Sequence, residues 1–453
     1  MFPFDESHWR IPFQSSPNGT SDGFNYQGYT FAGADPQNLN TYIAKLDYNV
    51  TQNGNHRLFV RGNLQGDRID QPPQFPGKMP TVATVVPSKG IAAGYTAVLT
   101  NNLINNFRYG FIRQALDQIG SGNVTFVDLR GMDTPSGQEN NSFKVAVPVH
   151  NFVDDLSWTK GKHTLQFGGN FRMVGDIRNS TLSSFSRGQT NASWLDVSGI
   201  ANKKHSLDPG APQFASLGLP VVDSGFDNAY DYPVMALTGI VSEVDARYNF
   251  TTQGQTLPDG TPNLRHFVAH EFETYVQDSF RVKPNLTVTY GLRWTLLQPP
   301  YEANGVQVAP TVSLNNWFNQ RQQTMLAGQP FNQPISFGIS GQANGKQPYW
   351  NYDYKDFAPR LALAYSPSFD HGWLGRLFGG PGKSSIRLGA GMYYDHFGEG
   401  VVNTFDRRGS FGLSTLLTNV GGVQDVDTAP RMPMNGLYTL PPSLLLPLRM
   451  EAS

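Results

Sequence analysis

Cysteine is absent from the 453-residue chain. Disulfide bonds, thiolate nucleophiles and cysteine–zinc sites are therefore excluded. Charged residues make up only 15% of the sequence, and 34 lysines and arginines are balanced by 35 acidic residues. This balance provides no basic surface of the kind that binds nucleic acid, so we expect no nucleic-acid partner.

Long apolar runs are also missing. No stretch of about 18 apolar residues occurs, which excludes a transmembrane helix but not a β-barrel, whose strands alternate apolar and polar residues. The first residues, MFPFDESHWRIPF, lack the charged start and apolar core of a signal peptide. An exported barrel needs such a signal, so we expect either a chain that is not exported or one whose true N-terminus lies upstream.

Glycine (47 residues), proline (32 residues) and aromatic residues (12%) are abundant. Abundant glycine, asparagine, threonine and tyrosine with few charges are typical of outer-membrane barrels, whose inner walls are polar. A chain of this length accommodates two or three soluble domains or one large barrel.

The clearest pattern lies between Glu271 and Leu297. From Leu286 to Leu296 every second residue is apolar, and the residues between them are polar or glycine. Side chains of a strand point alternately to opposite faces, so this pattern predicts one apolar and one wet face. Pro284 predicts a tight turn after a first β-rich run. A tilted strand of about 11 residues reaches roughly 25 Å, the height of a barrel's apolar band. A soluble β-sandwich would alternate in the same way.

Four further pairs of β-rich segments repeat this plan: 42–49 with 58–65, 91–100 with 103–116, 149–159 with 162–176, and 354–366 with 384–396. Links within the pairs are short, except for a glycine-rich one at 370–383. Links between the pairs are long, near 68–90, 118–148, 178–263 and 298–352. Compact soluble domains rarely contain unstructured loops beyond about 15 residues. The pattern therefore favours a barrel with short periplasmic turns and long extracellular loops.

We predict an all-β protein, a partial transmembrane antiparallel β-barrel of about 11–12 strands. Residues 41–398 form the barrel portion, after a loop-rich start at 1–40 and before an irregular tail at 399–453 that leaves the barrel incomplete. Residues 235–250 also have a strand pattern. They need a partner near 183–200, or else they belong to an extracellular hairpin.

Four phrases carry a family resemblance: GKHTLQFGGNFR (161–172), YVQDSFRVKPNLTVTYGLRW (275–294), FAPRLALAYSP (357–367) and SIRLGAGMYYDHFG (385–398). In this order they resemble TonB-dependent receptors of Gram-negative bacteria. The most similar subgroup is the Oar-like one, which has a carboxypeptidase-regulatory-like N-terminal domain. The resemblance covers roughly residues 40–400, in the middle of that family's barrel.

The resemblance implies an outer-membrane protein that imports a scarce solute when TonB pulls on a plug domain. A complete member carries a signal peptide, the regulatory-like domain, a plug with a TonB box and a 22-stranded barrel. We therefore expect this chain to be a fragment of a receptor or a truncated gene product. The implied partners are outer-membrane lipid, the plug, the TonB complex and a small solute, oligosaccharide or peptide ligand. No cofactor is implied.

Arginines recur on the predicted polar faces: Arg57, Arg61, Arg108, Arg172, Arg293 and Arg387. In a barrel they line the lumen, where they are candidates for pairing with a plug or for guiding anionic solutes. The alternative for each is a cross-strand ion pair with an Asp or Glu of the wall. The substrate itself cannot be read from these positions.

Other constellations do not predict chemistry. His266 and His270 share one face of a strand about 13 Å apart, too far to hold one metal ion together. The GGPGKSS segment (379–385) lacks the spacing and the following helix of a phosphate loop, and a turn before a strand explains it. Neighbouring carboxylates (Asp154 with Asp155, Glu271 with Glu273) have no evident partner, and no elbow motif frames a serine. We expect no catalytic residue, no metal site and no enzyme activity.

Three functions remain open at this point. The first is an outer-membrane TonB-dependent receptor that transports an unidentified solute. The second is an outer-membrane barrel for adhesion or surface organisation, without import. The third is a soluble β-rich carbohydrate-binding protein, whose tyrosines and leucines would point into a dry two-layer core.

Overall fold

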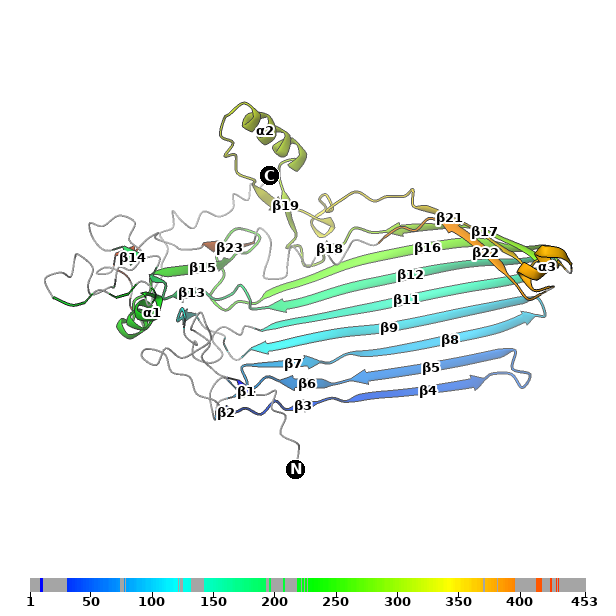
Figure 1. The fold of residues 1–453 in the computed structure, drawn as a ribbon, viewed down its shortest axis with the longest axis horizontal. Coiled ribbons are helices and arrows are strands. Elements are labelled where there is room, and N and C mark those ends of the chain that lie inside the picture. Colours follow the sequence, from blue (N-terminus) through cyan, green and yellow to red (C-terminus); the bar gives the residue numbers. More distant parts are fainter. Residues whose placement is uncertain are drawn as a thin grey trace.

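The main feature of the computed structural model is a 14-stranded antiparallel sheet (Figure 1). The structure describes chiefly residues 31–73, 79–120, 125–131, 142–192, 227–369, 371–380 and 382–395, with short pieces elsewhere between 9 and 431. The long strands, in chain order, are β4 (Thr41–Asn49), β5 (His56–Gln65), β8 (Lys89–Thr100), β9 (Leu103–Gly120), β11 (Phe143–Lys160), β12 (His163–Ser180), β16 (Asn263–Lys283), β17 (Leu286–Leu297), β21 (Phe357–Tyr365) and β22 (Ile386–Gly391).

Each long strand pairs with the next one along the chain, so the sheet is a meander. The five predicted pairs are its five hairpins, and the prediction of an antiparallel wall is confirmed. Segment 68–90 is not only a link, because β6 (Asp67–Asp70) and β7 (Val82–Val86) pair with each other within it. They extend the sheet beyond β5 and β8, and β3 (Gln37–Asn38) pairs with β6 and β18 (Tyr301–Glu302) with β16.

The wall has a turn end and a loop end (Figure 1). The short hairpin turns gather at the turn end, together with α3 (Gly372–Phe378) in the β21–β22 link, a helix that the sequence did not predict. Strands β9, β11 and β12 have 18 residues each and β16 has 21. At about 3.4 Å per residue they reach roughly 60 Å or more, so even when tilted they extend beyond a 25 Å apolar band.

The two faces of the wall have opposite character, which we call the apolar face and the polar face. On the apolar face Phe167, Val276 and Leu292 are 39%, 44% and 42% exposed. On the polar face Glu271 is 3% and Thr295 6% exposed. A water-soluble sandwich would bury the first set and expose the second. The exposure of the apolar set is the arrangement of a wall whose apolar face meets lipid.

Aromatic rings cluster on the apolar face across four neighbouring strands. Tyr109 packs on Phe152 at a ring-centroid distance of 5.0 Å, and Phe171 stacks on Phe272 at 4.6 Å. Nearer the turn end, His163 stacks on Phe280 at 4.4 Å. Four of these rings, from Tyr109 to Phe272, form one row across β9, β11, β12 and β16.

The sheet is open among the described residues. Strand β4 pairs only with β5 and strand β22 only with β21, so one edge of each strand has no partner there. Unpaired backbone groups are costly in lipid, where no water replaces the missing hydrogen bonds. In a membrane both edges therefore need further strands to pair with.

A second folded body, which we call the loop head, lies at the loop end. It contains a four-stranded sheet of β10 (Phe126–Asp128), β13 (Arg187–Gln189), β15 (Glu243–Asn249) and β23 (Ser414–Leu417), with helix α1 (Asp227–Thr238) nearby. Its core contains Ala192, Leu195, Met235, Ile240 and Ala429. The described parts of the loops at this end therefore form a folded unit with its own core.

The strand predicted at 235–250 belongs to the loop head. Its partner near 183–200 is β13, which pairs with β15 in antiparallel orientation, while β23 pairs with the rest of β15. The strand is shorter than predicted, because residues up to Thr238 belong to α1. Residues 235–238 end a helix, since Met235 is buried in the head core.

The loop between β17 and β21 carries its own small elements: β19 (Val308–Pro310), α2 (Leu314–Leu326), β20 (Phe337–Ile339) and η4 (Gln342–Asn344). The Ser313 side chain caps α2 by accepting a hydrogen bond from the backbone N–H of Asn316. In the part of the chain that the structure describes, no helix is long and apolar enough to cross a membrane. Most of the predicted start (1–40) and tail (399–453) lies outside the described residues.

Candidate functional site on the polar face

All six candidate arginines lie on the polar face. Within its hairpin each alternates with apolar-face neighbours, as the sequence predicts: Arg57 and Arg61 on β5, Arg108 on β9, Arg172 on β12, Arg293 on β17 and Arg387 on β22. Their ion pairs divide the six arginines into two groups. Three form ion pairs inside the sheet, and three do not among the described residues.

The first group centres on one row of the sheet. Arg293, Tyr275, Gly168 and Asp155 are direct neighbours across β17, β16, β12 and β11. The Tyr275 hydroxyl donates a 2.8 Å hydrogen bond to Asp155 Oδ1, and Arg108 forms an ion pair with Asp155 Oδ2. The Arg293 guanidinium lies 5.4 Å from the centre of the Tyr275 ring, a cation–π contact. These contacts join β17, β16, β11 and β9 in one polar chain that crosses β12.

Glutamates of β16 neutralise two of the arginines. Glu273 Oε2 lies 2.5 Å from Arg293 Nη1, and Glu271 Oε2 lies 2.5 Å from Arg172 Nη1. Glu271 is almost completely buried, and Arg172 compensates its charge inside the sheet. Cross-strand pairing therefore holds for Arg108, Arg172 and Arg293, and these three are not free cations for a solute.

Glycine makes this row possible. A Cβ atom at Gly168 would lie 2.2 Å from the Tyr275 ring and 2.6 Å from Asp155 Oδ1. Tyr275 therefore crosses β12 over a position that only glycine can occupy. Beside it lies a hollow of about 210 Å³ in the polar face, lined among others by Gln166, Gln277 and Arg360. The hollow offers amide and guanidinium donors to a polar group.

Arg57, Arg61 and Arg387 are exposed, and none of them forms an ion pair with another described residue. They lie toward the two edges of the wall, on β5 and β22. Their charges are not compensated by an acidic residue that the structure describes. Sequence reasoning missed the partners Asp155, Tyr275 and Glu273, although the alternation of polar residues on β11 and β16 contained the signal.

The carboxylate pairs named from the sequence behave differently. Asp154 and Asp155 are consecutive on β11 and point to opposite faces, so they cannot act together. Glu271 and Glu273 share the polar face, but each is held by its own arginine. Neither pair has the geometry of an acid–base couple.

Strand β16 also places the two histidines. His266 and His270 lie on the same face, four residues apart, as predicted, and Glu271 lies on the opposite face. The His270 ring nitrogen Nδ1 contacts Gln298 Oε1 at 2.8 Å. The backbone N–H of His266 donates to the buried carboxylate of Glu302. The contacts therefore tie β16 to the loop after β17. The GGPGKSS segment is a glycine turn with positive φ at 379, 380 and 382 before β22, as predicted.

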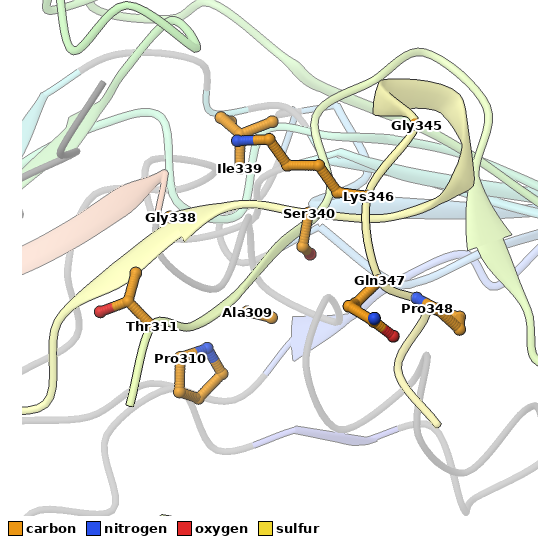
Figure 2. A pocket seen from close by; sticks show the side chains of 10 residues that line it. All are labelled: Ala309, Pro310, Thr311, Gly338, Ile339, Ser340, Gly345, Lys346, Gln347 and Pro348. Atoms are coloured by element: carbon orange, nitrogen blue, oxygen red, sulfur yellow. The ribbon is translucent and has the colours of Figure 1, made fainter. Parts of the chain in front are cut away.

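A groove of about 690 Å³ opens in the loop between β17 and β21 (Figure 2). It is lined by β19, β20 and residues 345–348, with the Lys346 amine, the Gln347 amide and the Ser340 hydroxyl as polar groups. Ser340 is buried, and its hydroxyl has no hydrogen-bond partner among the described residues. The groove is a second candidate contact surface at the loop end.

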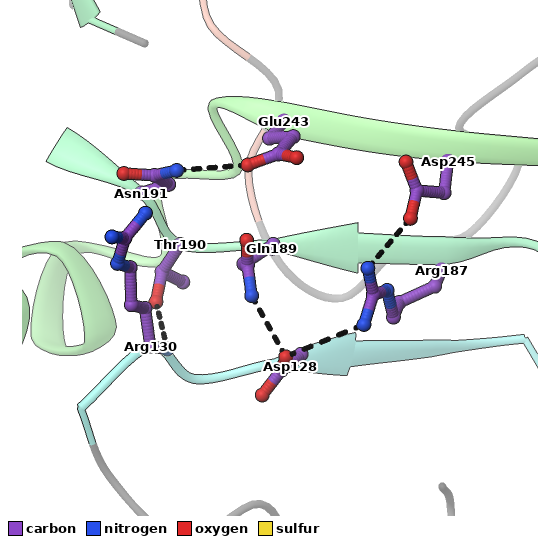
Figure 3. Close-up of polar contacts among 8 residues, drawn as sticks. All are labelled: Asp128, Arg130, Arg187, Gln189, Thr190, Asn191, Glu243 and Asp245. Atoms are coloured by element: carbon purple, nitrogen blue, oxygen red, sulfur yellow. Dashed lines mark hydrogen bonds and ion pairs between the residues drawn. The ribbon is translucent and has the colours of Figure 1, made fainter. Parts of the chain in front are cut away.

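Ion pairs also organise the loop head (Figure 3). Arg187 lies 2.6 Å from Asp245 and 3.8 Å from Asp128, which joins β10, β13 and β15. Gln189 donates to Asp128, and Asn191 donates to Glu243. In the same sheet, burial and the nearby Asp259 carboxylate raise the pKa of the Tyr248 phenol above its ordinary value.

These features define a class. A sheet with its apolar face exposed, long strands, short turns at one end and folded loops at the other is the wall of an outer-membrane β-barrel. The sequence agrees: residues 10–445 match the family model described as "Outer membrane beta barrel domain". The chain belongs to this family, and its place is the outer membrane.

Solved structures that are similar to parts of this chain were also found. They include the outer membrane transporter YddB from Escherichia coli (10% identity, TM-score 0.36, 80% of this chain and 41% of that one). BauA, the ferric preacinetobactin receptor from Acinetobacter baumannii, follows with 11% identity, TM-score 0.32, 73% of this chain and 37% of that one. A Pseudomonas aeruginosa FadL homologue gives 12% identity, TM-score 0.25, 79% of this chain and 62% of that one. The chain spans about two fifths of the first two proteins. A search of curated protein sequences gave no match.

Proposed function

We propose that the chain is part of a TonB-dependent, Oar-like receptor that binds a solute with its extracellular loops and admits it through the barrel. The observation that carries this proposal is the combination of a charged polar face with a folded loop head at its extracellular end. A purely structural wall needs neither. The sequence resemblance over residues 40–400 supports the same receptor class.

The proposed mechanism is gated passage without bond-making chemistry, so the protein is not an enzyme. A plug domain and the TonB complex are its proposed partners. The paired residues Arg108, Arg172 and Arg293 hold the wall rigid, because their charges are compensated within it. Arg57, Arg61 and Arg387 lie nearer the edges with uncompensated charge, where carboxylates of a plug or an anionic solute would bind them.

The test uses the intact protein in its own host. Cells with and without the gene are grown in medium supplemented with oligosaccharide and peptide mixtures, and mass spectrometry follows which solutes disappear from the medium. Receptor function predicts gene-dependent depletion of a solute, which stops when a proton ionophore collapses the inner-membrane gradient that energises TonB. Gene-dependent depletion that survives the ionophore would point to passive diffusion and contradict TonB dependence.

A second candidate, adhesion or surface organisation without import, is favoured by one observation. The loop head has its own apolar core and ion-pair network, as a binding module would. In the same experiment this function predicts no gene-dependent depletion of any solute but a loss of cell–cell or cell–surface attachment in the deletion strain. The soluble carbohydrate-binding alternative is set aside, since the chain belongs to the outer-membrane barrel family.

A further inference from the structure

One carboxylate lies on the apolar face of the wall and not on the polar face. Asp154 of β11 is exposed on the apolar face, among residues that meet lipid. Its neighbours along the strand on this face are Phe152 and Leu156, and its direct partner on β9 is Phe107. Apolar side chains thus border it on both sides along the strand, so the carboxylate lies on the surface that meets lipid.

The surface beside Asp154 is notched. Its direct partner on β12 is Gly169, where a Cβ atom would meet nothing nearer than the Glu273 carbonyl oxygen at 3.7 Å. Phe167 and Phe171 precede and follow this glycine on the same face. The floor of the notch is therefore bare backbone between two phenyl rings, with a carboxylate at its side.

Asp154 is only half satisfied. The Asn105 amide donates a 2.8 Å hydrogen bond to Asp154 Oδ1, and no described residue donates to Oδ2. A carboxylate in hydrocarbon without donors is costly, and ionisable residues inside a membrane therefore usually bind a partner. Elsewhere on this face the structure avoids that cost: Asp278 is buried beneath His163 and Tyr290, which both contact its Oδ2.

We propose that the notch formed by Asn105, Asp154 and Gly169 is a docking site for a transmembrane segment of another protein. That segment presents a lysine, arginine or side-chain amide to Asp154 at this depth. A missing side chain lets two backbones approach closely, and a polar contact adds directional binding, as in other contacts between membrane segments. Charge complementarity selects the occupant. A second copy related by two-fold symmetry would bring Asp154 against Asp154, and like charges repel in lipid.

Photo-crosslinking in the native host tests the site. In the intact protein Phe167 is replaced by p-benzoylphenylalanine, which is similar in shape and reacts with whatever touches the notch. The matched control carries the same group at Leu361, which is exposed on the apolar face of β21, away from the notch. We expect a protein adduct from position 167 and none from position 361.

Variants of Asp154 then separate a polar contact from mere proximity. Asp154→Leu is expected to lower the adduct yield at position 167 roughly tenfold, in the range of polar contacts between membrane segments. Asp154→Glu retains most of it. The purified Asp154→Leu protein should still migrate as a folded, heat-modifiable band, which shows that the loss is not due to misfolding.

The adduct must also have the right chemistry. Support requires that the crosslinked peptide, identified by mass spectrometry, lies in a membrane-spanning segment with Lys, Arg, Asn or Gln within reach of Asp154. Adducts only with lipid, adducts with a second copy of this chain, or a yield that Asp154→Leu leaves unchanged would each overturn the proposal. These outcomes are independent of solute uptake, so they do not bear on TonB dependence.

Discussion

The ion pair between Arg172 and Glu271 allows a quantitative test of how the polar face is held together. Glu271 is 3% exposed and its Oε2 lies 2.5 Å from Arg172 Nη1. Replacing Arg172 with methionine keeps the aliphatic stem but removes the cation that the buried Glu271 carboxylate binds. Loss of one partner of a buried pair costs about 3–5 kcal/mol. We therefore expect Arg172→Met to destabilise the barrel by that amount.

The pair between Arg108 and Asp155 is the matched control. It lies on the same face, but its side chains are 55% and 27% exposed, so water compensates the charge that remains. Exposed pairs contribute about 0–1 kcal/mol, and Arg108→Met should cost no more than that. The double variant Arg172→Met with Glu271→Met should regain most of the lost stability, because no buried charge is left unpaired.

The assay is urea unfolding of the intact protein in lipid vesicles, followed by tryptophan fluorescence and by heat-modifiable migration on gels. Folding free energies from the two readouts must agree before the variants are compared. If Arg172→Met and Arg108→Met cost the same, within about 0.5 kcal/mol, burial does not decide the strength of these pairs and the reasoning is refuted.

Three further predictions follow from the structure. Gly168→Ala should lower the free energy of unfolding by about 1–3 kcal/mol, because the new Cβ atom collides with the Tyr275 ring. In Gly110→Ala, on the same face, the new Cβ atom meets no atom within 4 Å, so this variant should be tolerated. Equal losses of stability in the urea assay would argue against the packing described. Met235→Ala should open the loop head and increase its cleavage by protease while the barrel stays folded, and Leu237→Ala, at an exposed position of the same helix, should not. The raised pKa of Tyr248 means that the folded head disfavours the phenolate, so head stability should fall as the pH rises past 10. Tyr248→Phe should remove the part of this loss that an ultraviolet titration assigns to Tyr248.

The hairpins could be predicted because strict alternation of apolar and polar residues fits a strand in a wall that meets lipid on one face and water on the other. Every second residue from Leu286 to Leu296 had to share a face, and the turn at Pro284 fixed where the strand began. The arginines were placed on the correct face for the same reason. The ionic partners of these arginines could not be predicted, since the register between strands far apart in sequence depends on backbone pairing that no single strand encodes.

The loop head could not be predicted from the sequence. Three of its four strands, β10, β13 and β23, have only 3, 3 and 4 residues, so they are too short to show a period, and only β15 has a recognisable strand pattern. The sequence pattern predicts a strand from Met235 onward, whereas residues 235–238 end helix α1, because this apolar segment is too short to distinguish the two periods. Only the buried core around Met235 decides in favour of the helix, and that core is assembled by tertiary contacts.

The scattered origin of the loop head has a consequence for how the cell surface is recognised. Residues near 127, 188, 246 and 416 become neighbours only in the folded protein. A synthetic peptide copied from any single loop lacks at least two of these four segments, because only β13 and β15 come from the same loop. Antibodies or phages that recognise the native head should therefore read a discontinuous epitope, and vaccines or affinity reagents against it need the folded barrel as the immunogen.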